Sequence, residues 1–339
     1  MDPSHERLQG RILVTGGAGF IGSALVRALN EAGSSRIVIA DLLGHDEKWK
    51  NLAPLAFEDY VEADRFLAAI ESNAAAFGRF DAIFHLGACS STTETDAAYL
   101  IRNNFEFTKS LCRWSLAQEA RFVYASSAAT YGDGTRGMRD DVDPSVFRPL
   151  NMYGYSKQLF DLWALREGLL PNIVGLKYFN VFGPNEYHKG SMRSLVCKAF
   201  EQIGSTGEIT LFRSHRPDYR DGEQMRDFVY VKDAVAMTLH LAGHATAGGL
   251  FNIGTGQPRT WLDLARALFR AMGVPEKIEF VDMPPAIRGQ YQYYTAADIT
   301  RLQSTNYRSS FFTLEDAILD YVTRYLIPHA RLGDEIDQG

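Results

Sequence analysis

Residues 12–30 read ILVTGGAGFIGSALVRALN, and the order of apolar and glycine residues in this segment determines which fold the chain can adopt. Ile12 to Val14 form a short apolar run of the kind that fills a buried strand. A glycine-rich turn interrupts the run, and apolar residues then return at helical spacing from Phe20 to Asn30. The pattern predicts a strand, a tight turn and a helix in direct succession.

The glycines of this turn, Gly16, Gly19 and Gly22, stand three residues apart where the strand meets the helix. Positions without a side chain let the backbone approach a diphosphate, and the helix amino end offers unpaired N–H groups and a positive dipole. Asp41 ends the second apolar strand, residues 36–40, and can accept hydrogen bonds from an adenosine ribose. We therefore expect a dinucleotide site; the alternative is that the glycines only permit close helix packing.

Apolar strands and helices alternate along the first half of the chain. Strand segments follow at residues 80–86, 121–125 and 173–179, and helical segments at 99–117 and 156–167. Strands separated by helices of this length form a parallel sheet covered on both faces. The fold class expected is α/β, a Rossmann-type doubly wound parallel sheet.

Past about residue 180 the alternation gives way to segments punctuated by glycine and proline, including a polar loop at 214–224. No Pro- or Ser-rich linker separates the parts, so two domains should interleave in sequence. We expect a dinucleotide-binding domain over residues 1–178, to which segments near 227–255 and 297–326 return. A smaller α/β substrate-binding domain should comprise residues 179–226 and 256–296.

Composition narrows the functional class. The 339 residues are 46% hydrophobic, and 35 Lys and Arg against 41 Asp and Glu give a net charge of -6, which disfavours nucleic-acid binding. Three widely spaced cysteines fit neither a disulfide framework nor a metal cluster, and no metal is expected. Neither a signal peptide nor a membrane-spanning run is evident, so we expect a cytoplasmic protein without a membrane partner.

A second pattern, a tyrosine and a lysine four residues apart, indicates candidate catalytic residues. Tyr153 and Lys157 stand four apart at the start of a helix and hence share one face. Ser127 lies at the carboxyl end of the strand beginning at Arg121, where such sheets bind ligands. A free phenol has a pKa of about 10, and the Lys157 ammonium and an oxidised nicotinamide would stabilise its ionised form. Tyr153 is therefore a candidate base.

These motifs, with RDFVYVKD at 226–233, resemble the extended short-chain dehydrogenase/reductases over about residues 11–325. The strings GACSSTTE at 87–94, SSAATYG at 126–132 and HKGSM at 188–192 are similar to one branch in particular, the ADP-L-glycero-D-manno-heptose 6-epimerases. This resemblance implies interconversion of the C6 epimers of an ADP-heptose used for lipopolysaccharide cores. It also implies NADP as cofactor, with NAD as the alternative, and a homo-oligomer, described as a pentamer.

The resemblance also assigns residues. The catalytic set would be Ser127, which bonds the substrate oxygen, Tyr153 and Lys189 as the two acid/base groups, and Lys157, which holds the nicotinamide ribose. Cofactor contacts would be Gly16, Gly19, Phe20, Ile21, Gly22, Asp41, Leu42, Lys48, Leu86, Gly87, Ala88, Cys89, Ser90, Asn103, Lys157 and Val181. Substrate contacts would be Asn180, Ser191, Lys198, Phe212, Arg226 and Tyr291.

The reaction explains why two acid/base groups are needed. The C6 hydrogen of a heptose is not acidic, because no neighbouring carbonyl stabilises a carbanion. Transient oxidation avoids this difficulty: hydride leaves C6 for the cofactor, the ketone rotates about C5–C6, and the hydride returns to the other face. After rotation the oxygen lies on the opposite side of the site, which gives Lys189 a purpose beside Tyr153. A solvated lysine is the alternative for Lys189.

Several alternatives remain at this stage. Asp41 favours NAD, whereas Lys48 could neutralise a 2'-phosphate or be an ordinary solvated lysine. A 4,6-dehydratase is disfavoured because Ala128 and Ala129, not an acid, follow Ser127. A UDP-sugar 4-epimerase of the same family gives Lys189 no evident role, and a non-catalytic dinucleotide sensor would not need the four catalytic groups. His188 is read as a surface or orienting residue and Cys89 as a packing residue.

Overall fold

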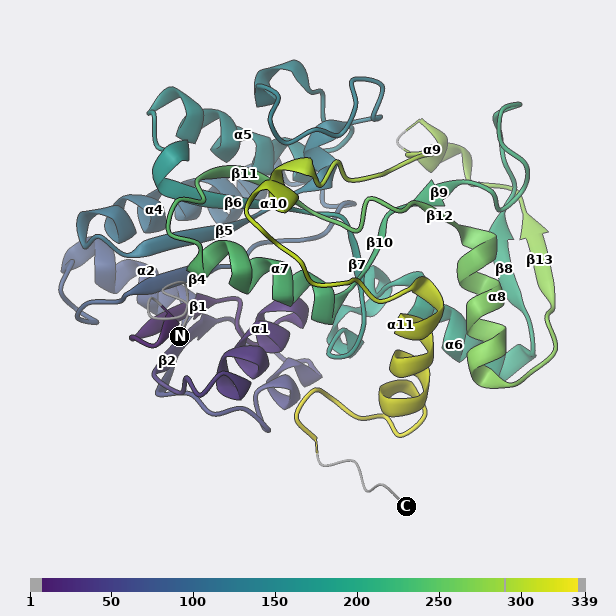
Figure 1. Cartoon of the computed structure of the whole chain (residues 1–339), viewed down its shortest axis with the longest axis horizontal. Helices are drawn as coiled ribbons and strands as arrows, with labels where there is room; N and C mark the ends of the chain where they lie inside the picture. The colour runs from purple at the N-terminus through teal and green to yellow at the C-terminus, as the bar shows by residue number, and fades with distance from the viewer. Residues whose placement is uncertain (1–7, 290, 335–339) are drawn as a thin grey trace.

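A seven-stranded parallel sheet forms the centre of the computed structural model, which describes residues 8–289 and 291–334 (Figure 1). The strand order is β11-β6-β5-β4-β1-β2-β3, and every neighbouring pair is parallel. The strands are β1 (Ile12–Thr15), β2 (Ile37–Asp41), β3 (Asp59–Glu62), β4 (Ala82–His85), β5 (Arg121–Ser127), β6 (Ile173–Tyr178) and β11 (Gly249–Ile253). The expected Rossmann-type doubly wound sheet is confirmed.

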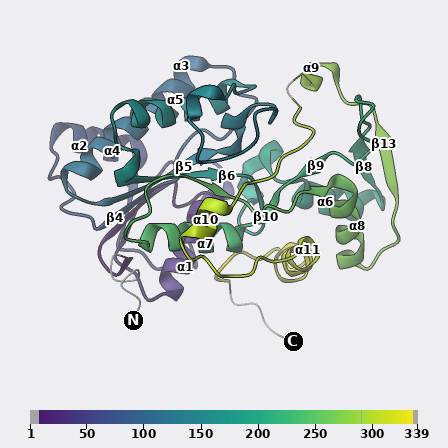
Figure 2. The same cartoon turned by 45° about the horizontal axis from the view of Figure 1, so that its top comes forward.

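Helices cover both faces of the sheet (Figure 2). One face carries α2 (Ala63–Ser72), α4 (Phe107–Ala117) and α5 (Met152–Arg166), and the other carries α1 (Phe20–Glu31) and α7 (Val231–Gly243). Phe66, Trp114 and Phe160 are buried on the first face. Leu25 and Met237 are buried on the second. Each such side chain contributes roughly 1.5–3 kcal/mol by leaving water, so burial on both faces holds the layers together.

The order of strands reverses beside β1. The chain moves outward in one direction through β2 and β3, and in the other through β4, β5 and β6. At such a switch point the loops that leave the carboxyl ends of neighbouring strands diverge and leave a crevice between them. Thr15 of β1 is in register with Ala40 of β2 and His85 of β4, so three of these loops begin at one level.

Some local elements differ from the sequence-based expectation. The helix expected over 99–117 consists of α3 (Ala97–Leu100), a π-helical segment η3 (Ile101–Glu106) and α4. The helix expected from residue 156 begins at Met152, because the Asn151 side chain accepts a hydrogen bond from the Gly154 N–H and caps it. Tyr153 is therefore the second residue of α5.

A second group of elements lies beyond the sheet, at the right of Figure 1. Helices α6 (Leu195–Thr206) and α8 (Trp261–Met272) lie beside the parallel pair β8 (Ile209–Phe212) and β13 (Ile278–Val281). Two small ribbons join this group to the sheet: β7 (Asn180–Phe182) pairs with β10 (Phe228–Tyr230), and β9 (Met225–Arg226) pairs with β12 (Arg259–Thr260). β11 returns to pair with β6. The domain limits given above stay a prediction.

Short helical segments complete the described chain. They are η2 (Glu47–Asn51), η4 (Ala128–Tyr131), η5 (Pro144–Val146), η6 (Leu170–Asn172), η7 (Tyr187–Met192), α9 (Pro285–Arg288), α10 (Thr300–Ser304), α11 (Leu314–Tyr321) and η8 (Val322–Leu326). Within residues 8–289 and 291–334, no helix has the length and apolar character needed to cross a membrane.

Candidate active site

The glycine turn between β1 and α1 is shaped to receive a diphosphate. Gly16 has a φ of +70°, and a Cβ there would lie 2.5 Å from the Gly87 nitrogen. A Cβ on Gly22 would lie 2.0 Å from the Gly16 oxygen, so neither position accepts a side chain. Gly19 caps α1 without a side-chain hydrogen bond, which leaves the amino end of the helix open to an anion. These features fit the pyrophosphate of a dinucleotide.

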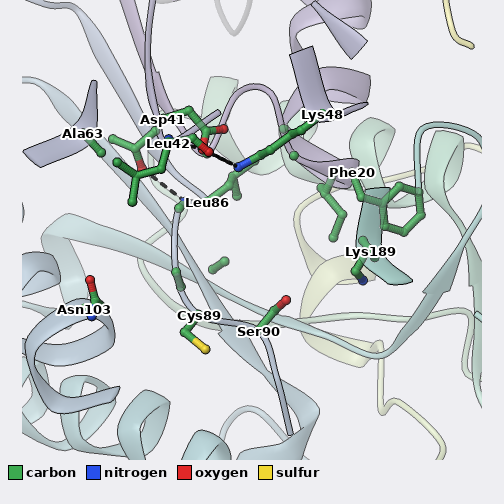
Figure 3. Close-up of a pocket in the computed structure, with 18 of the residues that line it drawn as sticks. Phe20, Asp41, Leu42, Lys48, Ala63, Leu86, Cys89, Ser90, Asn103 and Lys189 are labelled. Carbon is green, nitrogen blue, oxygen red and sulfur yellow. Dashed lines mark hydrogen bonds and ion pairs between the residues drawn. The ribbon is translucent and has the colours of Figure 1, made fainter. Parts of the chain in front are cut away.

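A cavity of about 480 Å³ opens beside this turn (Figure 3). It extends from Asp41 at the end of β2 and Lys48 in η2 to Cys89, after β4, and Asn103 in η3. Most of the expected cofactor contacts line it, namely Gly16, Gly19, Phe20, Ile21, Gly22, Asp41, Leu42, Lys48, Leu86, Gly87, Ala88, Cys89, Ser90 and Asn103. The size and lining of the cavity suit an elongated dinucleotide.

Asp41 and Lys48 form an ion pair at one end of this cavity, with 2.5 Å between the Asp41 Oδ1 and the Lys48 Nζ. Asp41 also accepts hydrogen bonds from the N–H groups of Ala18 and Leu42. The carboxylate is thus fixed to the glycine turn, while the lysine holds a positive charge beside it. Lys48 is consequently placed within the cavity lining and is not a freely solvated side chain.

Ser127, Tyr153 and Lys157 meet at the carboxyl end of β5. Burial raises the pKa of Tyr153, and a hydrogen bond with the Ser127 side chain opposes this rise. Lys157 is buried and donates a hydrogen bond to the Ala125 oxygen at 2.9 Å. Burial lowers the pKa of Lys157 to about 8, against the opposing charge of Asp161. The sequence predicts that Lys157 stabilises the Tyr153 phenolate. In the protein without a bound cofactor, Lys157 is not among the groups that shift the pKa of Tyr153.

Lys189, on η7, lines the cavity beside the glycine turn. Its ammonium lies 5.3 Å from the centre of the Phe20 ring, and Figure 3 shows both residues on the side of the cavity opposite Asn103. Burial lowers the pKa of Lys189, whereas the nearby Glu186 carboxylate raises it. A lysine amine with a lowered pKa exchanges protons more readily near neutral pH than a solvated one.

A second cavity, of about 630 Å³, continues from the first toward α6 and α8. Both cavities are lined by Phe20, Ile21, Ser90, Tyr178, Lys189 and Met192. Ser127 and Tyr153 line the second cavity, together with the expected contacts Asn180, Val181, Lys198, Phe212 and Tyr291. Val181, expected at the cofactor, thus lies at the second cavity. Lys189 lines both cavities, whereas Tyr153 lines the second one.

Arg226 is held between two aromatic rings that line the second cavity. Its guanidinium carbon lies 5.5 Å from the centre of the Trp261 ring and 4.9 Å from that of Tyr291. Arg226 is only 6% exposed, and the groups that act on its charge are the phenols of Tyr291 and Tyr219 rather than carboxylates. A buried arginine with no carboxylate partner among the residues that the structure describes is suited to bind an anionic ligand.

Three further residues considered in the sequence analysis have different surroundings. Ser191 is exposed on η7, and its backbone oxygen accepts a hydrogen bond from the Lys198 Nζ at 3.2 Å. His188 is half-buried, and burial with the charge of Lys48 lowers its pKa to about 4, so the ring is neutral at pH 7. Cys89 is half-buried beside Asn104, which bonds its backbone N–H and oxygen.

Sequence reasoning missed Trp261, whose indole N–H donates to the Tyr291 hydroxyl at 2.8 Å. The only local signal is its place as the first residue of α8, between the capping-box residues Thr260 and Asp263. Nothing in that signal indicates contact with Arg226. Among the side chains described, no three His, Cys, Asp or Glu residues gather in a way that could hold a metal ion.

Comparisons with known proteins agree with this geometry. Residues 12–254 match the model of the NAD dependent epimerase/dehydratase family. ADP-L-glycero-D-manno-heptose-6-epimerase of Nitratidesulfovibrio vulgaris strain Hildenborough is 53% identical over 93% of this chain and 97% of its own length. The enzyme of that name from Fusobacterium nucleatum is 42% identical over 93% of this chain and 98% of its own.

Solved structures show the same architecture. The Helicobacter pylori ADP-L-glycero-D-manno-heptose-6-epimerase superimposes with a TM-score of 0.77 at 29% identity, covering 96% of this chain and 99% of that one. UDP-N-acetylglucosamine 4-epimerase from Methanobrevibacter ruminantium shares the fold, with a TM-score of 0.80 at 23% identity over 95% of this chain and 99% of that one. The chain therefore belongs to the NAD dependent epimerase/dehydratase family and, within it, to the ADP-L-glycero-D-manno-heptose-6-epimerases.

Proposed function

We propose that this chain interconverts ADP-D-glycero-D-manno-heptose and ADP-L-glycero-D-manno-heptose by inverting C6. The observation that carries the proposal is the position of Lys189, which lines both cavities together with Phe20 and shares the lining of the second cavity with Ser127 and Tyr153. Two proton-exchanging groups on different elements suit a centre whose oxygen changes sides during the reaction. The names of the relatives support the substrate assignment.

We propose NADP as the cofactor of the first cavity. A nicotinamide dinucleotide, when bound, supplies reversible removal and return of the hydride at C6. The glycine turn and the amino end of α1 would hold its pyrophosphate, and Asp41 its adenosine ribose. Lys48, which stands 2.5 Å from Asp41, supplies the positive charge that a 2'-phosphate requires. The other residues that line this cavity are proposed as cofactor contacts.

Tyr153 is proposed as the acid/base group on one side of C6. Its hydroxyl would take the proton of the sugar hydroxyl, which Ser127 would hold in place by a hydrogen bond. Because burial alone raises the pKa of the phenol, Tyr153 needs positive charge nearby when it acts as a base. Lys157, one helical turn away on α5, is proposed to provide it and to bind the nicotinamide ribose.

Lys189 is proposed as the acid/base group on the other side. Rotation about C5–C6 carries the oxygen away from Tyr153 and toward η7. The lowered pKa of Lys189 makes its ammonium a better proton donor than that of a solvated lysine. Tyr153 and Lys189 thus serve opposite C6 configurations; which group serves which epimer stays open.

The second cavity is proposed to bind the sugar nucleotide. Arg226 would bind the substrate diphosphate, since its guanidinium is buried, is fixed by the rings of Trp261 and Tyr291, and has no carboxylate partner within residues 8–289 and 291–334. Asn180, Ser191, Lys198 and Phe212 are proposed as further contacts. Cytoplasmic location, supply of lipopolysaccharide precursors and a homo-oligomer, pentameric by resemblance, are proposed with this function; sedimentation of the purified protein tests the oligomer.

The substrate is tested by incubating the NADP-loaded protein with ADP-D-glycero-D-manno-heptose, and separately with UDP-glucose and dTDP-glucose, followed by chromatographic separation of the epimers. We expect conversion of the heptose alone. Conversion of UDP-glucose with the heptose untouched would instead establish a 4-epimerase, and binding of NADP without any turnover would establish a sensor.

The catalytic roles are tested by Tyr153→Phe and Lys189→Met. Each should lower kcat by about 10²- to 10⁴-fold while NADP affinity stays near that of the parent, because each removes proton transfer and not cofactor binding. The double variant should be nearly inactive. Tyr155→Phe, which changes an exposed tyrosine of the same helix, and Lys277→Met at the surface are matched controls that should keep full activity. Wild-type turnover by Tyr153→Phe would contradict the mechanism.

A further inference from the structure

The loop that carries Lys189 is anchored by three consecutive residues to three separate parts of the molecule. Asn185 donates from its side chain to the Ser23 hydroxyl in α1 and accepts from the Leu332 N–H. Glu186 accepts from the backbone N–H and the hydroxyl of Ser194 before α6. Tyr187 donates to the Tyr325 and Ala330 oxygens near the end of the described chain. Asn185 and Glu186 are buried, residues 187–189 are half-buried, and the loop is exposed at Gly190 and Ser191.

One buried side chain outside the loop joins it to the cofactor cavity. Asn51, at the end of η2, is 2% exposed. Its Nδ2 donates to the Ala18 oxygen in the glycine turn and to the Asn185 oxygen at the base of the loop, both at 3.0 Å. The same atom lies 3.4 Å from the His188 Nδ1, beside Lys189 in the chain. A single carboxamide therefore connects the phosphate-binding turn with the loop of the second acid/base group.

The segment that holds Asn51 is also fixed at its other end. Lys48, in the same short helix, pairs with Asp41, and Asp41 accepts a hydrogen bond from the Ala18 N–H. Both backbone polar groups of Ala18 are thus used: its N–H donates to Asp41 and its oxygen accepts from Asn51. Glu47 also connects η2 to the loop through Arg331. The Arg331 guanidinium pairs with Glu47 at 2.7 Å and lies 5.2 Å from the centre of the Tyr187 ring.

We propose that Asn51 is a positioning residue for Lys189. By tying η7 to the segment that contacts the adenosine end of the cofactor cavity, it fixes the distance between the cofactor site and the second acid/base group. The proposal rests on the proposed function, because it takes Lys189 to be one of the two proton-exchanging groups. Asn51 itself lines neither cavity and would touch neither substrate nor cofactor.

The physical reason is the number of acceptors that depend on this one amide. Without it, the Ala18 and Asn185 oxygens lose a buried donor, and a buried carbonyl without a partner is unfavourable enough to move toward water or another donor. Such a shift begins at Asn185, three residues before His188 and four before Lys189, and so displaces the amine. A displacement near 1 Å in a reacting group lowers its rate by up to about 10²-fold.

The test compares Asn51→Ala with Asn30→Ala. Asn30 is a matched control: its Nδ2 also donates to two backbone oxygens, those of Ser34 and Ala56, but it lies at the end of α1 outside both cavities. In the protein without cofactor, hydrogen exchange of residues 187–192 should be faster in Asn51→Ala and unchanged in Asn30→Ala. Asn51→Ser serves as a second variant should the alanine variant fail to fold.

The decisive measurement follows the absorbance of the reduced nicotinamide after the NADP-loaded protein is mixed with each epimer in turn. Lys189→Met should slow this reaction with one epimer only, and Asn51→Ala should slow it with the same epimer by about 10- to 100-fold. With the other epimer Asn51→Ala should stay within about 2-fold of the parent. Added to Lys189→Met, Asn51→Ala should have little further effect, because the group it positions is gone.

Equal slowing of both epimers by Asn51→Ala, or an undiminished effect in the Lys189→Met background, would show a merely structural role and overturn the inference. An unchanged exchange rate at residues 187–192 would also overturn it. Should Lys189→Met itself keep full activity, the proposed role of Lys189 would fail and this inference with it. An effect of Lys189→Met that Asn51→Ala does not follow would overturn the inference alone.

Discussion

Lys48 should determine whether the protein prefers NADP or NAD. Its Nζ lies 2.5 Å from the Asp41 carboxylate in the cofactor cavity, and the side chain is 17% exposed. In the Lys48→Met variant the similar length of the side chain is kept, but the positive charge is lost. The Asp41 carboxylate then faces the cavity uncompensated, held by the N–H groups of Ala18 and Leu42.

The magnitude follows from the contact that is lost. A hydrogen bond to a charged group contributes about 1.5–3 kcal/mol. Since 1.4 kcal/mol is a factor of ten in affinity, Lys48→Met should weaken NADP binding by about 10- to 100-fold. NAD carries no 2'-phosphate, and its ribose hydroxyls can use the Asp41 oxygen that Lys48 has left. The NAD affinity should therefore stay within about 3-fold of the parent or improve.

Titration calorimetry of both dinucleotides against the parent and Lys48→Met proteins measures these affinities directly. Lys50→Met is the matched control, because Lys50 belongs to the same short helix but pairs with Glu47 and does not line the cavity. It should leave both affinities unchanged. A Lys48→Met protein that binds NADP as tightly as the parent does would refute the reasoning, as would an equal loss of affinity for NAD.

Other outcomes follow from the same geometry. Gly22→Ala should abolish dinucleotide binding and destabilise the fold by about 1–3 kcal/mol, because the new Cβ would lie 2.0 Å from the Gly16 oxygen. Calorimetry measures the binding and thermal melting measures the stability. Gly204→Ala, with open space around its Cβ, is the control and should change neither. Arg226→Gln should raise the KM for the ADP-heptose by about 10- to 100-fold with little change in kcat, since it removes a diphosphate contact remote from C6; a lowered kcat at unchanged KM would argue against this role. In the kcat–pH profile, kcat should fall as the pH rises through about 8, because burial holds the pKa of Lys157 near 8 and Lys157 is charged only below that pH. His188, with a pKa of about 4, should add no inflection between about pH 5 and 7.

The sheet and the cofactor cavity could be predicted because their signals are local. The strand β1, the glycine turn and α1 are continuous in sequence. β2 and β4 lie on either side of β1 in the sheet, so the residues that follow them line the same cavity. The predicted start of α5, residue 156, is four residues later than the observed start at Met152, because the apolar pattern does not reveal the Asn151 cap. β3 was missed because it is four residues long and mostly accessible, which leaves a weak apolar pattern.

The arrangement of the second cavity could not be derived in this way. Arg226, Trp261 and Tyr291 come from β9, α8 and the segment after α9, and only the tertiary fold brings their rings and charge together. The same holds for Asn51, which reaches Ala18 and Asn185 across long separations in the chain. These residues follow no regular spacing in the sequence, and their long-range contacts do not change the local helix or strand pattern from which a prediction is made.

The central claim is that C6 is inverted by oxidation and reduction within one turnover, and the fate of the C6 hydrogen tests it most directly. ADP-D-glycero-D-manno-heptose with deuterium at C6 would be converted by the NADP-loaded protein in ordinary water, and the recovered epimer examined by mass spectrometry and NMR. Retention of the deuterium at C6 in the product, without entry of solvent hydrogen, is the predicted result. Replacement of the label by hydrogen from water would show that the C6 hydrogen leaves as a proton and would contradict the account.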